Sequence, residues 1–417
     1  MDMEITPRLL RGEVTPPPSK SQAHRLLIAA SLTDGESEIA GLSLSQDVLA
    51  TMRCMEALGA RFAREDDRLL VRGVFHGGAR PEFPEPPRLD CGESGSTLRF
   101  LIPVALAVAG GGVFTGRGRL MERPMQPYEA LFAEKGVSFV QKDGTITVKG
   151  TLYPGEYRLP GNVSSQFFTG LLFALPMLDG VSRVASTTRL ESSGYLDMTI
   201  DALNTAGVGV AACRRPSDGG ESFAVFGPAE YRAFRRRVEA DWSQAAFFLA
   251  SKGLGGGVSL SGMNPDSCQG DAVVADWAGE LEGPDDLEID VSDTPDLVPP
   301  LAAWAALRTG RVTRLTGAER LRLKESDRLE AVACELGKLG ADVAQGSGSL
   351  TIRGVDTLRG GTADSRNDHR IAMMLAVAAT RADGPVTIRG AECVAKSYPD
   401  FWDVYRSLGG VIREVSA

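Results

Sequence analysis

The chain has 417 residues, with 45 Lys and Arg against 54 Asp and Glu, so its formal net charge is −9. A net acidic chain lacks the basic footprint that sequence-independent nucleic-acid binding needs, so we expect no nucleic-acid partner. The length predicts two or three domains, because a domain usually has roughly 100–200 residues. The net charge does not exclude binding of small anionic ligands, since such ligands respond to local rather than net charge.

Cysteine usage and hydropathy predict a soluble, cytoplasmic protein. The six cysteines form no CxxC pair, and the three histidines do not complete a zinc-binding spacing, so we expect no metal. Scattered single cysteines suit a reducing compartment. The first residues lack the apolar core of a signal peptide, and the longest apolar stretch, 101–114, is too short and too glycine-rich to span a membrane.

A repeated pattern runs along the chain. An apolar-periodic helix ends at a glycine, and two short strands joined by a polar turn follow it. The glycines that end these helices are Gly59, Gly136, Gly207, Gly340 and Gly409. The gap between Gly207 and Gly340 is close to twice each of the others, which predicts a sixth, degraded copy at residues 271–290.

Six copies grouped three and three predict an α/β (α+β) fold with two similar domains. We expect the boundary near residues 236–244, where the third copy has ended and a new helix begins. Because helix–glycine–hairpin is a common local pattern, chance is the alternative. The regular spacing and the strand–x–Gly ending shared by four copies favour a true repeat.

In the first half, hydroxyl, amide and cationic side chains gather where helices are expected to begin. Backbone N–H groups at a helix N-terminus, together with such donors, favour anion binding. Each cluster alone is equally typical of a helix cap or a solvated basic helix end. The residues at these positions are Lys20, Ser21, Arg25, Gly95, Arg99, Arg123, Ser164, Ser165, Gln166, Ser192, Ser193 and Tyr195.

Two of these positions carry local predictions. Gly95 lies in a Gly/Ser/Thr-rich loop, where small side chains let a ligand approach the backbone closely. The loop is not a Walker loop, because no GK[ST] follows it. Arg123 precedes a proline, which predicts extended rather than helical backbone.

The second half adds carboxylates and further cations. Asp296 lies just ahead of an apolar segment, so it is either a general-base candidate or a helix cap. Lys324 and Arg328, which flank Glu325, are four residues apart, a spacing that would let them share a helix face. Other polar residues near the starts of apolar segments are Arg320, His369, Arg370 and Lys396.

The motifs SKSQAHR, GESGSTLRF, ERP, VSSQF, LKESDR and DHRIAM follow one another along nearly the whole chain. Together they resemble the 5-enolpyruvylshikimate-3-phosphate synthase family of enolpyruvyl transferases. That resemblance implies two domains of the inside-out α/β barrel type, each with three βαβαββ units. It implies a shikimate 3-phosphate domain at 20–239 and a catalytic, phosphoenolpyruvate-side domain at 1–19 plus 240–417, with the active site in the cleft between them.

The family's reaction joins two phosphorylated substrates without a cofactor. The enolpyruvyl group of phosphoenolpyruvate moves to the 5-hydroxyl of shikimate 3-phosphate by addition and elimination, and phosphate is released. The reaction belongs to the shikimate pathway, which leads to chorismate and the aromatic amino acids. The resemblance also implies a cytoplasmic monomer with no membrane partner.

The resemblance implies roles for individual residues. Asp296, Glu325 and Lys20 are the implied catalytic residues. The implied shikimate 3-phosphate ligands are Lys20, Ser21, Arg25, Ser164, Ser165, Gln166, Ser192, Tyr195, Asp296 and Lys324. The implied phosphoenolpyruvate ligands are Lys20, Gly95, Arg123, Gln166, Arg328, Arg370 and Lys396, with His369 and Arg320 as further candidates.

Two rival functions stay open. The sister enzyme that uses UDP-N-acetylglucosamine carries a catalytic cysteine on a loop of its first half, but residues 110–126 contain none. A catalytically inactive phosphosugar-binding module is the other rival. The presence of Asp296, Glu325 and Lys20 together argues against it.

Overall fold

The computed structural model describes residues 1–78, 81–214 and 220–415. The chain divides into two compact units. The first unit is Pro18–Glu239, and the second unit combines Met1–Pro17 with Ala240–Ala417. Among the described residues, the helices are all too short or too polar to cross a membrane.

The first unit has six α-helices and twelve strands among its described residues. Its helices are α1 (Lys20–Ser31), α2 (Gln46–Ala57), α3 (Gly95–Ala109), α4 (Gln126–Glu134), α5 (Gln166–Ala174) and α6 (Gly194–Thr205). Its strands are β3 (Glu36–Ala40), β4 (Arg61–Glu65), β5 (Arg68–Arg72), β6 (Arg88–Asp90), β7 (Gly111–Thr115), β8 (Ser138–Lys142), β9 (Thr145–Lys149), β10 (Glu156–Leu159), β11 (Gly180–Ser186), β12 (Val210–Arg214), β13 (Glu221–Gly227) and β14 (Arg235–Arg237).

The second unit has six α-helices and ten strands in the part of the chain that the structure describes. Its helices are α7 (Trp242–Gly253), α8 (Val274–Glu282), α9 (Val298–Ala305), α10 (Arg328–Lys338), α11 (His369–Ala379) and α12 (Phe401–Ser407). Its strands are β1 (Asp2–Thr6), β2 (Arg11–Val14), β15 (Gly257–Leu260), β16 (Leu287–Asp290), β17 (Val312–Thr316), β18 (Asp342–Gln345), β19 (Leu350–Arg353), β20 (Gly361–Asp364), β21 (Val386–Arg389) and β22 (Val411–Val415).

Five of the sheets share one design. In β6-β7-β9-β8, β10-β11-β13-β12 and β16-β17-β19-β18, a parallel pair is followed by two antiparallel pairs, and the chain order is βαβαββ. The sheets β14-β3-β5-β4 and β20-β21-β1-β22 have the same pairing. In these two, one strand comes from a distant part of the chain, β14 in the first unit and the N-terminal β1 in the second.

The glycine-ended helices follow the predicted pattern. Gly59, Gly136, Gly207, Gly340 and Gly409 all have positive φ angles between 69° and 105°. Glycine adopts this region without the steric cost that a Cβ brings, so it reverses the chain from helix into strand. The repeat prediction is therefore confirmed for the first four copies in full and for the fifth with β1 completing its strand pair.

The sixth copy of the repeat lacks its hairpin altogether among the described residues, whereas the sequence predicted a degraded one. Residues 271–290 form α8 and then β16, which is the first strand of the next sheet rather than part of a hairpin. The corresponding sheet has only two described strands, β15 and β2, paired in parallel. The expected strand–helix–strand–helix part is present, and the closing hairpin is missing from the described residues.

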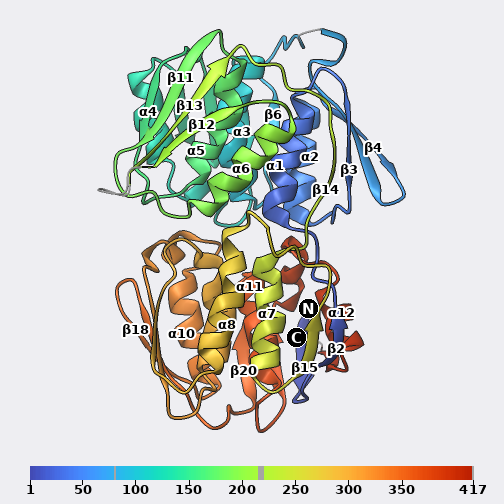
Figure 1. The fold of residues 1–417 in the computed structure, drawn as a ribbon, viewed down its shortest axis with the longest axis vertical. Helices are drawn as coiled ribbons and strands as arrows, with labels where there is room; N and C mark the ends of the chain where they lie inside the picture. Colours follow the sequence, from blue (N-terminus) through green and yellow to red (C-terminus); the bar gives the residue numbers. More distant parts are fainter. Residues whose placement is uncertain (79–80, 215–219, 416–417) are drawn as a thin grey trace. The chain divides into compact units, whose positions relative to one another are not determined.

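Helices occupy the interior of each unit. Every residue of α9 and α11 is buried, and so is every residue of α5 after Gln166. Figure 1 shows α1 and α2 beside β3 and β4, and α7, α8, α10 and α11 running side by side in the second unit. The sheets are separate and lie outside these helices, which is the inside-out arrangement that the family resemblance implies.

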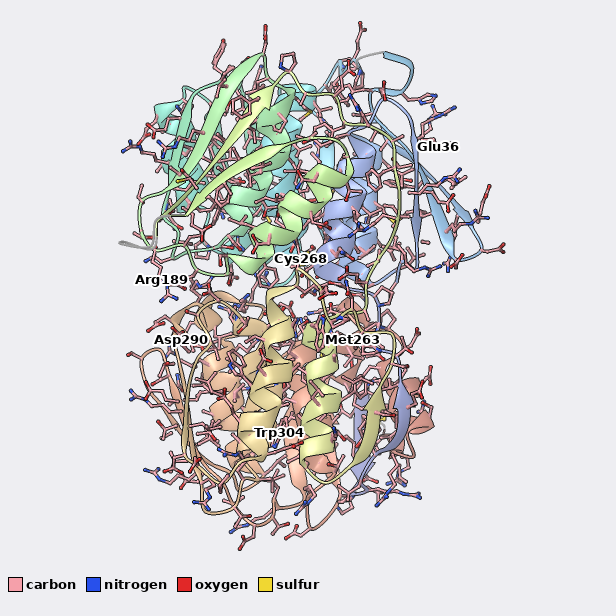
Figure 2. The ribbon with its side chains drawn as sticks, viewed as in Figure 1. Glu36, Arg189, Met263, Cys268, Asp290 and Trp304 are labelled. Atoms are coloured by element: carbon pink, nitrogen blue, oxygen red, sulfur yellow. The ribbon has the colours of Figure 1, made fainter. Side chains whose placement is uncertain are left out.

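The close packing inside the second unit predicts a stability effect at Gly253. A Cβ added there would meet the ring of Trp304, a buried residue of α9 that Figure 2 labels. We expect Gly253→Ala to lower stability by about 1–3 kcal/mol, the usual cost of overpacking a core. Thermal unfolding should show a lower midpoint. Gly279→Ala on α8 is the control, because nothing lies within 4 Å of its added Cβ; equal midpoints for both variants would contradict the prediction.

Candidate active site

In the first unit, the starts of three buried helices carry predicted site residues. Lys20 begins α1, Gly95 begins α3 and Gln166 begins α5. The starts of α3 and α5 are joined directly, because Gln166 donates a hydrogen bond from Nε2 to Ser96 Oγ at 2.9 Å. A helix N-terminus presents free N–H groups and a partial positive charge, so this arrangement favours an anion.

Two guanidinium groups lie close to this junction. Arg99 donates from Nη1 to Gln166 Oε1 at 2.8 Å and from Nη2 to the Pro124 carbonyl at 3.2 Å. Burial, with the nearby charge of Arg123, lowers the pKa of Arg99 to about 9. Among the described residues, neither arginine has a carboxylate partner, and Nε of Arg123 is buried without a hydrogen bond. A buried cation without a carboxylate partner, such as Arg99, is costly unless an anion joins it.

The backbone at Arg123 has the predicted conformation. Its φ and ψ are −67° and 144°, which is extended, as expected before Pro124. A Cβ added to Gly95 would lie 2.5 Å from Arg123 Nη1. A side chain at position 95 would therefore displace the guanidinium from the start of α3.

Arg25 is buried between two aromatic rings. Its guanidinium lies 5.1 Å from the ring centre of Phe100 and 5.9 Å from that of Tyr195. It donates from Nε to Thr199 Oγ1 at 2.9 Å and from Nη1 to the Ser21 carbonyl at 2.7 Å. These contacts bring together three of the residues predicted from sequence, Ser21, Arg25 and Tyr195.

The remaining predicted residues of the first unit also lie at helix starts. Ser164 accepts a hydrogen bond from the Gln166 backbone at 3.3 Å, whereas the Ser165 side chain makes no capping bond to α5. Ser192 is buried and has a φ of 60°, which is uncommon for a residue with a Cβ. Lys20 forms an ion pair with Asp47 Oδ2 at 3.0 Å.

In the second unit, Asp296 is surrounded by cations. It lies in a short 3₁₀ helix, Pro295–Leu297, just before α9. Its Oδ1 is 2.9 Å from Arg328 Nη1 and 3.4 Å from Lys324 Nζ, and its Oδ2 is 3.0 Å from Arg370 Nη2. Its side chain therefore binds cations of three segments, and the general-base position predicted from sequence lies inside a cluster of cations.

Arg328 connects this cluster to the start of α11. It binds Asp368 Oδ2 through Nε at 2.9 Å and Oδ1 through Nη2 at 3.2 Å. Burial alone would lower the pKa of Arg328, but the charges of Asp368 and Asp296 raise it above its ordinary value. Ser326 donates to Asp368 Oδ2 at 3.0 Å, and Asp368 Oδ1 caps the Arg370 backbone at 3.0 Å.

Other predicted residues surround the same helix start. His369 Nδ1 lies 2.9 Å from Glu325 Oε2, and Lys396 Nζ donates to the Asn367 carbonyl at 2.7 Å. Arg320 donates to the carbonyl of Ser292, four residues before Asp296. The second unit thus brings all its predicted site residues to the starts of α9, α10 and α11.

A metal site is one reading of the Glu325, Asp368 and His369 side chains. Ligand atoms of the three lie within 4.8 Å of one another. Both Asp368 oxygens, however, already accept hydrogen bonds from Arg328, and Glu325 binds the His369 ring. Ion pairing with the guanidinium accounts for this cluster without a metal.

One local prediction was wrong, and four positioning residues were missed. Lys324 and Arg328 do not share a helix face, because Lys324 has extended backbone before α10 and only Arg328 lies in the helix. Both still reach Asp296. The residues that sequence reasoning did not single out for these contacts are Asp47, Ser96, Pro124 and Asp368. Ser96, Pro124 and Asp368 lie inside the motifs GESGSTLRF, ERP and DHRIAM, whereas Asp47 gave no signal.

Comparison with solved structures defines the class. The fold matches an EPSP synthase structure from Acinetobacter baumannii with a TM-score of 0.78 and 25% identity, over 99% of this chain and 100% of that one. The chain is thus an α/β protein of the two-domain transferase class that this structure represents.

Comparison of sequences defines the family. Residues 5–405 match the family model described as EPSP synthase (3-phosphoshikimate 1-carboxyvinyltransferase). A 3-phosphoshikimate 1-carboxyvinyltransferase from Clostridium kluyveri is 42% identical, over 99% of both chains. One of the same name from Clostridium beijerinckii is 41% identical, over 99% of this chain and 98% of the relative. The chain belongs to the EPSP synthase family.

The environment of Lys324 predicts a pH effect on anion binding. Burial, reinforced by Arg328 and Arg320 and opposed by Asp296, lowers its pKa from 10.5 to about 8. The ammonium is therefore charged below pH 8 and loses its charge as the pH rises through that value. We expect the dissociation constant for sulfate, a probe whose charge is constant, to rise about tenfold between pH 7 and 9.

Lys324→Arg is the matched variant for this prediction, because a guanidinium stays charged throughout this pH range. Sulfate-dependent thermal stabilisation would be measured across the range for both proteins. A sulfate affinity of the native protein that stays flat to pH 9.5, or an identical decline in Lys324→Arg, would contradict the assignment.

Proposed function

We propose that this chain transfers the enolpyruvyl group of phosphoenolpyruvate to the 5-hydroxyl of shikimate 3-phosphate and releases phosphate. The observation that carries the proposal is Asp296, a carboxylate held within hydrogen-bond distance of Arg328 and Arg370 and at 3.4 Å from Lys324. A general base placed inside an anion-binding cluster is what this reaction needs, since a hydroxyl must be deprotonated beside a phosphorylated, carboxylate-bearing partner.

Two groups of residues hold the two substrates in this proposal. The shikimate 3-phosphate ligands are Lys20, Ser21, Arg25, Ser164, Ser165, Gln166, Ser192, Tyr195, Asp296 and Lys324. The phosphoenolpyruvate ligands are Lys20, Gly95, Arg123, Gln166, Arg328, Arg370 and Lys396. The substrates repel each other, and the cations among these residues offset that repulsion.

The addition step forms one C–O bond. Asp296 takes the proton of the 5-hydroxyl as its oxygen attacks C2 of phosphoenolpyruvate, while the methylene carbon gains a proton from Glu325, with Lys20 as the second group in that role. In the elimination step, the methyl carbon returns a proton to Glu325, the C2–O bond to phosphate breaks, the enol ether forms, and the phosphate leaves with the proton that Asp296 took. Protons therefore balance over the two steps, and no redox partner is required.

Substrate binding also prepares the base. Without ligand, Arg328, Arg370 and Lys324 all bind the Asp296 carboxylate. An incoming phosphate or carboxylate competes for the same donors, because charge-assisted hydrogen bonds to guanidinium are formed equally well by either anion. Losing these donors raises the proton affinity of Asp296 at the moment when it must accept a proton.

Phosphate release from phosphoenolpyruvate, measured with and without shikimate 3-phosphate, tests the function. We expect release only when shikimate 3-phosphate is present. Asp296→Asn should lower kcat by about 10²–10⁴, the usual contribution of general-base catalysis. Asp276→Asn, an exposed carboxylate change on α8, is the control and should keep native turnover. Native turnover in Asp296→Asn would refute the base assignment, and turnover with UDP-N-acetylglucosamine instead would refute the substrate.

The contact between Gly95 and Arg123 predicts a selective effect on one substrate. In Gly95→Ala the new methyl forces the Arg123 guanidinium to move, so KM for phosphoenolpyruvate should rise by on the order of tenfold to a hundredfold. KM for shikimate 3-phosphate should change much less. Gly209→Ala, where the added Cβ meets nothing within 4 Å, is the control. An unchanged KM for phosphoenolpyruvate would remove Gly95 and Arg123 from its binding site.

The setting of the enzyme is also part of the proposal. All six cysteines are free thiols, which suits a reducing cytoplasm. We expect a monomer, as the resemblance to the family implies. Sedimentation velocity would check the oligomeric state.

A further inference from the structure

We infer that Glu335 is a positioning residue for the anion site of the second unit, acting through Arg366 on the carbonyl that holds Lys396. The inference rests on the proposed function, because Lys396 is there a phosphoenolpyruvate ligand. Glu335 lies two turns beyond Arg328 on α10, at a spacing that puts both side chains on one face of the helix. Glu335 itself touches none of the proposed substrate ligands.

The Glu335 carboxylate is fully buried, and both of its oxygens accept hydrogen bonds. Its side chain has 0% exposure. Oε1 accepts from Arg366 Nε at 2.7 Å, and Oε2 accepts from the Asp364 backbone at 2.8 Å. Lys338 donates to both oxygens, at 2.8 Å and 2.7 Å. A buried carboxylate is tolerated when charged and backbone donors satisfy it in this way, so its partners are held firmly.

The segment that Glu335 holds has an unfavourable backbone. Arg366 and Asn367 have φ angles of 53° and 54°, so two consecutive residues with a Cβ lie in the left-handed region. Such conformations persist only where surrounding contacts impose them. The contacts here are the Glu335–Arg366 ion pair, the hydrogen bond from the Arg366 backbone to Asp364 Oδ1 at 2.7 Å, and that from the Asn367 backbone to Ser365 Oγ at 3.2 Å.

This unusual turn directs a backbone carbonyl at the proposed ligand. The Asn367 carbonyl accepts from Lys396 Nζ at 2.7 Å. Lys396 is 4% exposed, so the direction of its ammonium is set by the few groups that it touches. Without the left-handed pair, the carbonyl would point elsewhere and the ammonium would lose this partner.

Helix α10 therefore holds the β20–α11 connection at two points. At one end, Arg328 binds Asp368, the cap of α11. At the other, Glu335 binds Arg366 and the Asp364 backbone. Asn367 lies between these two points, and its carbonyl accepts the hydrogen bond from the Lys396 ammonium. Burial alone would raise the pKa of the Glu335 carboxyl, but the hydrogen bonds that it accepts lower the pKa below its ordinary value. Glu335 is therefore an ionised partner for Arg366.

Glu335→Gln tests the inference, because it keeps the shape and removes the charge. We expect KM for phosphoenolpyruvate to rise on the order of tenfold, while KM for shikimate 3-phosphate stays near its native value. A merely structural role would lower the thermal midpoint without separating the two KM values. Arg366→Ala is a second variant with the same expected KM change, and it leaves Glu335 its Lys338 and Asp364 donors.

A double-mutant cycle with Lys396→Ala decides whether the effect passes through Lys396. If it does, Glu335→Gln adds little to KM in the Lys396→Ala background. Lys338→Met is the matched control, because Lys338 binds the same carboxylate from within α10 and should leave both KM values unchanged. Additive effects of Glu335→Gln and Lys396→Ala, or an equal KM change in Lys338→Met, would overturn the inference.

Failure of the proposed function gives a different result. If Lys396→Ala alone leaves KM for phosphoenolpyruvate unchanged, the assignment of Lys396 as a ligand is wrong. If Lys396→Ala raises that KM and Glu335→Gln does not, the ligand assignment stands and the positioning role of Glu335 is refuted.

Discussion

The second unit depends on one buried guanidinium. Arg328 is 2% exposed and lies between Asp368, which it binds with two nitrogens, and Asp296. A guanidinium in this position is costly without such partners, and removing either carboxylate would leave charge uncompensated. Because the three residues come from α10, the start of α11 and the segment before α9, one ion-pair network fixes the relative placement of these elements within the unit.

The first unit also holds two arginines near a helix start, but these two arginines have no carboxylate partner among the described residues. Arg99 and Arg123 lie close together at the start of α3, and neither is paired with a carboxylate among the described residues. The neighbours of Arg99 are an amide, a carbonyl and an aromatic ring. In the second unit an internal carboxylate fills the anion position, whereas in the first the position calls for an anion from outside.

The repeated architecture explains why the site residues recur at helix starts. In each unit, buried helices lie inside and the sheets lie outside, so the N-termini of several helices can meet at one end. Each N-terminus contributes unpaired N–H groups and a partial positive charge. The polar residues are placed there by the chain order of the repeat, which returns to the same end with each strand–helix pair.

Much of the fold could be predicted because its signals are local. Apolar periodicity marks the helices, glycines with positive φ end them, and polar pairs form the hairpin turns. These local signals, with their regular spacing, predicted four full repeats. The sixth copy was harder to predict, because α8 has a normal helical pattern and no local sequence signal indicates that its hairpin is missing. The sheets completed by β1 and β14 were equally hidden, since their strands are distant in sequence.

The sequence by itself determined which residue types stand at each helix start, and their order identified the family. Only the tertiary structure decided which of them touch. Lys324 and Arg328 meet at Asp296 although they share no helix face, because extended backbone before α10 brings the lysine there from another direction. Asp368 and Glu335 gained their roles in the same way, since a buried charge is satisfied by whichever partner packing brings to it, and packing joins residues that are far apart along the chain.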